Sequence, residues 1–172
     1  MIDPLVVLAL QGFLATLLVV EGGRKLAPGN NFRAALASYG MVPRSLLPLA
    51  ATLLALAEIL SGMMLAVSIA APFVLVIMLS YLAVIVRSIS SGLAVADCGC
   101  SFGKRPSPLS RWHVVRAAVL AAASAIVYLN MPSSPTDWRS VQAVPAIGCL
   151  WLLYLACDQM ISTAARLEPG DA

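Results

Sequence analysis

Residues 46 to 86 are the feature that most constrains this chain, because Glu58 is the only acidic or basic side chain in the whole stretch. As one helix it would be roughly 60 Å long at about 1.5 Å per residue, twice the ~30 Å thickness of the hydrocarbon core of a bilayer. Proline is tolerated in the first turn of a helix and disruptive in its middle, so the break is expected at Ser68 to Pro72. The pattern predicts two transmembrane helices, 46–68 and 71–87.

Three further apolar stretches, 4–22, 112–129 and 141–161, are long enough to cross a membrane. Only 11% of the residues are charged and 60% are hydrophobic, against roughly 25% charged residues in a soluble domain. This composition excludes a soluble globular enzyme and a disordered chain. We expect an all-α transmembrane bundle of four to five spans, forming one integral-membrane domain over residues 1–172.

The amino-terminal stretch is preceded by Asp3 and not by a basic region, so we interpret it as a retained helix and not as a cleaved signal peptide. A short helical pattern around Phe32, Leu36 and Tyr39 is expected to lie along the membrane surface. No block of five Lys or Arg occurs, which argues against nucleic acid as a partner and leaves membrane lipid.

Basic residues gather in the first and third loops: Arg24, Lys25, Arg33, Arg44, Arg87, Lys104, Arg105 and Arg111. With five spans, the positive-inside rule then places the amino terminus outside and Cys98 in the cytoplasm.

Two cysteines, Cys98 and Cys100, lie one residue apart in the polar loop 88–111. A disulfide between them would close a tight, strained ring that is easily reduced. Gly99 frees the intervening backbone, while Lys104 and Arg105 supply positive charge that favours a thiolate. This loop therefore suits thiol–disulfide exchange better than it suits a structural cross-link.

Two other interpretations of the pair stay open. The thiols could be idle, or they could hold Cu(I) or zinc as a soft-metal site. No histidine or third cysteine lies nearby in the sequence, so no metal site is predicted.

Cys149 and Cys157 lie in the last span, about 12 Å apart along a helix axis, which is too far for a disulfide. We expect both to be small packing residues inside the bundle. The functional alternative is that one of them relays a disulfide to Cys98 and Cys100.

Glu58 needs a partner or a proton, because an ionised carboxylate inside a span costs at least ~2.5 kcal/mol. Arg116 and Arg87 are the candidate partners, either in an ion pair that fixes helix register or in a proton-handling site. Glu21 is expected to be solvated or paired with Arg24 or Lys25.

The sole histidine, His113, could accept a proton from a thiol or bind a quinone carbonyl, although such histidines are usually interfacial. Interhelical hydrogen bonds are expected from Gln11, Ser80 and Tyr81.

Several segments together resemble the MauE branch of the DoxX-like membrane proteins. They are residues 23–26 (Gly-Arg-Lys-Leu), 32–36 (Phe-Arg-Ala-Ala-Leu), 58–62 (Glu-Ile-Leu-Ser-Gly) and 97–100 (Asp-Cys-Gly-Cys), with Arg116 in the next helix. The resemblance covers residues 10 to 130, and only its Cys-Gly-Cys element is specific. Ser101 departs from the pattern, because relatives run from the second cysteine directly into phenylalanine.

This resemblance implies a multi-pass protein of the bacterial inner membrane that helps to mature the small subunit of methylamine dehydrogenase, alongside a thioredoxin-like periplasmic protein. Cys98 and Cys100 would be the redox pair and quinone the candidate cofactor, with Glu58, Arg116 and His113 in support. Such a role would need the cysteine loop in the periplasm, the face opposite to the one that the positive-inside rule favours. A non-catalytic assembly or docking subunit and a soft-metal-handling protein are the alternatives.

Overall fold

A computed structural model describes residues 2–27, 32–91, 111–130 and 139–167. The described part is helical throughout, with turns between the helices. Its elements are α1 (Pro4–Leu26), α2 (Phe32–Ser38), the 3-10 turn η1 (Arg44–Leu46), α3 (Leu47–Ala66), α4 (Ala71–Ser90), α5 (Arg111–Leu129) and α6 (Arg139–Leu167).

Five of the helices are long and apolar enough to cross a membrane: α1, α3 with its preceding turn, α4, α5 and α6. Helices suit this setting because they satisfy every backbone hydrogen bond within one segment. Large apolar side chains such as Leu53, Phe73 and Leu152 point outward, each more than half exposed. The all-α bundle expected from the sequence is confirmed, and the chain is a multi-pass membrane protein.

Local sequence sets where these helices begin. Asp3 caps α1 by accepting a hydrogen bond from the Leu5 backbone N–H at 2.8 Å. Proline occupies the first turn of α1, α3 and α4, where its missing N–H costs nothing and its fixed backbone angle fits the helix.

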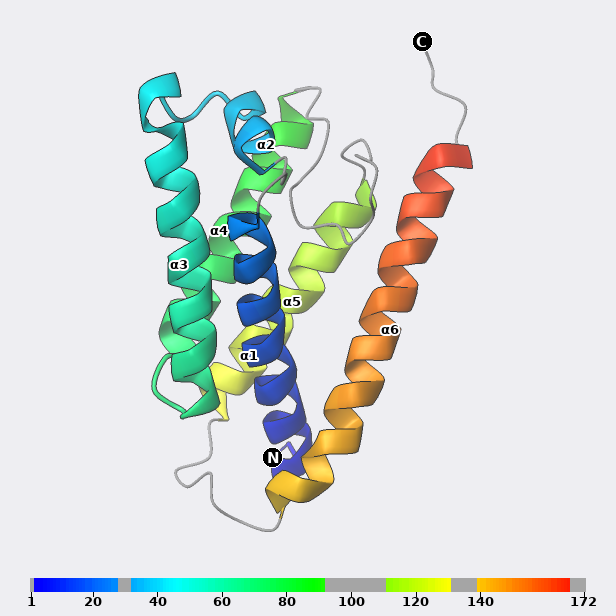
Figure 1. Cartoon of the computed structure of the whole chain (residues 1–172). Coiled ribbons are helices and arrows are strands. Elements are labelled where there is room, and N and C mark those ends of the chain that lie inside the picture. The colour runs from blue at the N-terminus through cyan, green and yellow to red at the C-terminus, as the bar shows by residue number, and fades with distance from the viewer. Residues whose placement is uncertain (1, 28–31, 92–110, 131–138, 168–172) are drawn as a thin grey trace.

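The long helices alternate in direction, with α1 against α3, α5 and α6, and with α4 packed on α5 (Figure 1). One end of the bundle carries α2, and we call it the α2 end. The carboxyl ends of α1, α4 and α6 and the amino ends of α3 and α5 also lie there (Figure 1). Functional side chains near these five helix ends can therefore lie close together at the α2 end.

Two glycines bring α1 and α3 into close contact. A Cβ atom on Gly22 would lie 2.7 Å from the Ala55 carbonyl oxygen, and one on Gly62 would lie 2.7 Å from the Ala15 carbonyl oxygen. Small residues at such crossings let helix backbones approach closely, which is how helices commonly associate in membranes.

The α3–α4 turn lies at the opposite end of the bundle, where the sequence predicted a break. Ser68 adopts a left-handed conformation with φ of 64°, and the N–H groups of Ser68 and Ile69 donate to the carbonyls of Leu65 and Met64. Gln11 of α1 donates to the Leu65 carbonyl at 2.8 Å and to Ser68 Oγ at 2.9 Å. The interhelical role predicted for Gln11 is confirmed.

Candidate functional site

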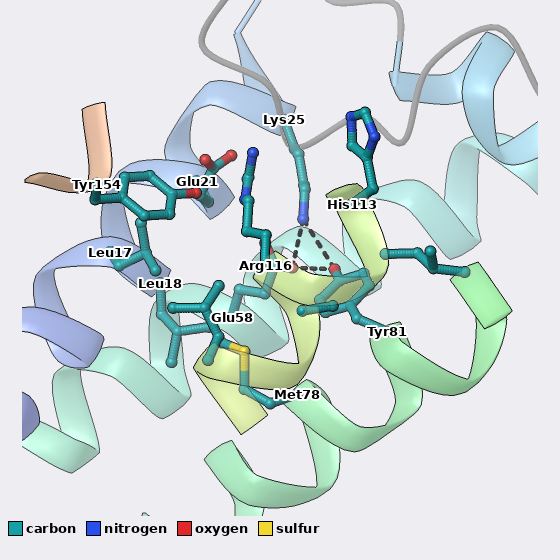
Figure 2. Close-up of a pocket in the computed structure, with 13 residues that line it drawn as sticks. Leu17, Leu18, Glu21, Lys25, Glu58, Met78, Tyr81, His113, Arg116 and Tyr154 are labelled. Carbon is teal, nitrogen blue, oxygen red and sulfur yellow. Dashed lines mark hydrogen bonds and ion pairs between the residues drawn. The ribbon is translucent and has the colours of Figure 1, made fainter. Parts of the chain in front are cut away.

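The most buried ionic group in the described residues joins Lys25, Glu58 and Tyr81, from α1, α3 and α4. Lys25 Nζ and the Tyr81 hydroxyl both donate to Glu58 Oε1, and Lys25 Nζ also lies 2.8 Å from Tyr81 Oη (Figure 2). The side chains of Lys25 and Glu58 are each 1% exposed. Two opposite charges are thus held together out of contact with solvent and lipid.

Aromatic rings complete the surroundings of the ammonium group. Lys25 Nζ lies 4.7 Å from the centroid of the Tyr81 ring and 5.0 Å from that of Phe32 in α2. The negative face of an aromatic ring attracts a cation, the more so when water is excluded. The helix α2 therefore helps to hold the charge at the end of α1.

A second ion pair ties α5 to α6. Arg116 Nη1 lies 2.5 Å from Asp158 Oδ1, and the side chains are 13% and 3% exposed. The guanidinium group also stacks 4.9 Å from the centre of the Tyr154 ring. Because α6 otherwise packs mainly on α1, this pair fixes α6 against α5 near the α2 end.

A cavity of about 60 Å³ lies between these two ion pairs. Its polar lining comes from five helices, and Figure 2 shows these side chains around it: Glu21, Lys25, Glu58, Tyr81, His113, Arg116 and Tyr154. By the same measure one water needs roughly 10–15 Å³, so the cavity has room for a few water molecules.

The two carboxylate oxygens of Glu58, which lines this cavity, have different surroundings. Glu58 Oε2 is buried and has no hydrogen-bond partner among the described residues, whereas Oε1 accepts from both Lys25 and Tyr81. A buried carboxylate oxygen without a donor is costly and often marks a functional group or an ordered water. Glu58 therefore keeps one oxygen to which no group of the described residues donates.

A second and larger cavity, of about 530 Å³, forms a groove between α5 and α6. We call it the α5–α6 groove. Its lining is apolar apart from Arg116 and Cys157, and it includes Phe13, Trp112, Val115, Val119, Leu120, Leu150, Leu153, Tyr154 and Met160. Arg116, Leu120 and Tyr154 line both cavities, so the polar cavity and the groove adjoin.

The sequence profile described as "Methylamine utilisation protein MauE" matches residues 3–130. The chain belongs to the MauE family. The chain is also 28% identical to the methylamine utilization protein MauE of Methylophilus methylotrophus, over 96% of this chain and 93% of that protein. No solved structure gives a significant match.

The structure brings together three residues singled out in this MauE-family sequence, because Glu58, His113 and Arg116 all line the polar cavity. The predicted partner of Glu58 was wrong: Lys25 pairs with it, not Arg116 or Arg87. Lys25 lies at the end of α1, and its long stem carries the ammonium group into the bundle. The interhelical role predicted for Tyr81 is confirmed.

Three other polar residues, Glu21, His113 and Ser80, lie in surroundings that differ from those predicted. Glu21 pairs with Arg24 at 3.7 Å, as one alternative held, but it is buried and not solvated. His113 is 4% exposed, so it lies inside the bundle and not at the interface. Ser80 was predicted to bond between helices and instead donates to Val76 of its own helix at 2.8 Å.

The cysteines of the MauE-family chain fall into two groups. Cys98 and Cys100 lie outside the residues that the structure describes. The described chain stops at Ser91, after α4, and resumes at Arg111 with α5; the carboxyl end of α4 and the amino end of α5 lie at the α2 end (Figure 1). Cys149 and Cys157 are free and exposed, so their predicted burial inside the bundle was wrong. Both lie on outward parts of α6, and Cys157 lines the groove.

Two site residues were missed in the sequence. Lys25 was counted as a basic residue of the first loop and as a candidate partner of Glu21, not of Glu58, and Asp158 was passed over as part of the last span. The available signal was the same one that exposed Glu58: an ionisable residue within or beside a span requires a partner.

Proposed function

We propose that this MauE-family protein is a thiol–disulfide exchange protein of the bacterial inner membrane, acting in the maturation of the small subunit of methylamine dehydrogenase. Cys98 and Cys100 are its redox pair. The observation that carries the proposal is the buried polar cavity at the α2 end, because this is the end at which the cysteine segment joins α4 and α5. An inert anchor has no need for two glutamates, a lysine, a histidine and an arginine around one cavity there.

A client dithiol, or the thioredoxin-like partner that carries its electrons, attacks the Cys98–Cys100 disulfide; the client gains an S–S bond and the pair becomes two thiols. Regeneration removes two electrons and two protons from Cys98 and Cys100. A lipid-soluble quinone supplies that oxidising capacity, since it takes up two electrons and two protons to become a hydroquinone.

The residues of the polar cavity accept and transfer the protons that are released when Cys98 and Cys100 are oxidised. Glu58 Oε2 is available as an acceptor, and His113, two residues after the start of α5, lines the same cavity with an imidazole that can accept or donate a proton. Lys25 and Tyr81 hold the other Glu58 oxygen in place, while Asp158 holds Arg116.

Serine substitution tests this proposal directly. We expect Cys98→Ser or Cys100→Ser to abolish methylamine dehydrogenase maturation, and Cys100→Ser to trap a mixed disulfide between Cys98 and a soluble thioredoxin-like protein. Cys149→Ser is the matched control, because that thiol is free and exposed on α6, and it should leave maturation intact. Normal maturation in the double variant at Cys98 and Cys100 removes the redox role.

One observation favours a second candidate, an assembly or docking subunit with incidental cysteines. The two ion pairs connect α1 with α3 and α5 with α6, which is also what a structural scaffold requires. This candidate predicts tolerance of the serine substitutions together with loss of maturation on substitution of Glu58 or Arg116.

A further inference from the structure

We propose that the α5–α6 groove binds a lipid-soluble quinone, with the ring beside Arg116 and the apolar tail between α5 and α6. The inference rests on the proposed function, because the quinone is the oxidant that Cys98 and Cys100 require. It adds a location, a binding mode and the residues that contact the ligand.

The groove has the size and lining that the tail requires. Its volume of about 530 Å³ falls within the roughly 300–1,000 Å³ typical of small-molecule pockets. Val115, Val119 and Leu153 line it and are 51%, 62% and 63% exposed. These side chains face the membrane, so a molecule dissolved in the bilayer can enter sideways without crossing water.

The inner edge of the groove has the polarity that the ring requires. Arg116 lines both the groove and the polar cavity, and a guanidinium group carries five N–H donors. A quinone carbonyl is an acceptor of the kind that such a group binds. Tyr154 also lines both cavities, and its ring, already stacked on Arg116, gives the quinone ring an aromatic neighbour.

The adjoining cavity supplies the proton route that distinguishes a quinone from an ordinary lipid chain. Reduction converts both quinone carbonyls to hydroxyls, with two electrons and two protons coming from Cys98 and Cys100 as their S–S bond forms. Glu58 Oε2 has no hydrogen-bond partner in the described residues and lines a cavity of water size. A lipid acyl chain would need neither a buried carboxylate nor a polar cavity beside Arg116.

Two cysteines on one helix make the site measurable without any activity assay. Cys157 lines the groove, whereas Cys149 is exposed on α6 and does not line it. In a Cys98→Ser/Cys100→Ser protein reconstituted in lipid vesicles, these are the only thiols left. The probe is a fully substituted benzoquinone with a short alkyl tail, because such a ring has no open position for thiol addition.

We expect this quinone to slow the reaction of Cys157 with an uncharged maleimide several-fold and saturably, with no change at Cys149. The alcohol with the same alkyl tail should protect much less. Val119→Phe fills the groove and should remove the protection, while Val76→Phe on α4, equally exposed and outside both cavities, should keep it.

Arg116 is tested together with its partner, so that no buried charge is left alone. The paired change Arg116→Met/Asp158→Leu keeps apolar packing and should reduce protection by the quinone to the level seen with the alcohol. Equal protection by quinone and alcohol in the parent protein would show a lipid slot and overturn the proposal, as would no protection at all. Since Cys98 and Cys100 are absent from this assay, its failure is distinct from a failure of the redox role in cells.

Discussion

At the residue scale, the decisive fact is that Glu58 binds Lys25 and not an arginine. The sequence was sufficient to show that this carboxylate needs a partner, because a lone charge inside a span is costly. It was not sufficient to choose the partner, since that depends on which helices are neighbours. Lys25 reaches Glu58 because α1 packs closely on α3, whereas Arg116 is held by Asp158 on α6.

Removing one charge of this pair should be far more damaging than removing both. Glu58→Leu leaves the Lys25 ammonium group buried without its carboxylate, and we expect it to lower the free energy of unfolding by about 3–5 kcal/mol. Lys25→Met/Glu58→Leu should recover most of that loss, because a well-packed apolar pair of similar volume is often neutral. Thermal unfolding of the purified proteins in detergent provides the comparison.

The same pair of variants separates a proton role from a structural one. If the double variant is as stable as the parent and still matures the client, then Glu58 serves only the fold. Our proposal expects the double variant to be stable and defective in maturation.

At the scale of helices, the sequence identified the elements well and their contacts poorly. Long apolar runs and the Ser68–Pro72 break predicted four to five spans, and five helices of the described residues are long and apolar enough to cross a membrane. The first was expected to end at residue 22, yet α1 continues to Leu26. Of the two glycines near this end, Gly22 faces α3, whereas nothing lies within 4 Å of a Cβ on Gly23.

Adjacent glycines therefore give a matched test of the α1–α3 contact. A Cβ on Gly22 would meet the Ala55 carbonyl oxygen at 2.7 Å, so Gly22→Ala should destabilise the protein by about 1–3 kcal/mol through overpacking. Gly23→Ala should be neutral or stabilising by up to ~1 kcal/mol, because alanine favours helix. Urea or thermal unfolding of both variants in detergent measures the difference, and equal stabilities would show that α1 and α3 are not in close contact here.

At the scale of the whole molecule, the bundle has two unlike ends. The α2 end brings together the two ion pairs, the polar cavity and the helix ends that flank the cysteine segment. The opposite end carries the α3–α4 turn with its Gln11 contact. Sequence analysis singled out Gln11, Glu58 and Arg116 but missed Lys25 and Asp158 as their partners. It also did not predict that these residues converge, because convergence arises from the alternating directions of the helices.

This asymmetry makes the orientation of the bundle a sharp test of the proposed function. The basic residues of the α2 end favour the cytoplasm by the positive-inside rule, although Lys25 is buried against Glu58 and is not a loop charge. Exchange with a periplasmic client requires the same end to face outward.

We therefore expect a membrane-impermeant maleimide to label Cys98 and Cys100 in intact, reduced cells, in a Cys149→Ser/Cys157→Ser background that leaves only this pair. In cells that have not been reduced, an oxidised pair should not be labelled, because a disulfide does not react with a maleimide. Labelling only after permeabilisation would place the pair in the cytoplasm and exclude direct exchange with periplasmic methylamine dehydrogenase, while leaving quinone binding to be decided by the protection of Cys157.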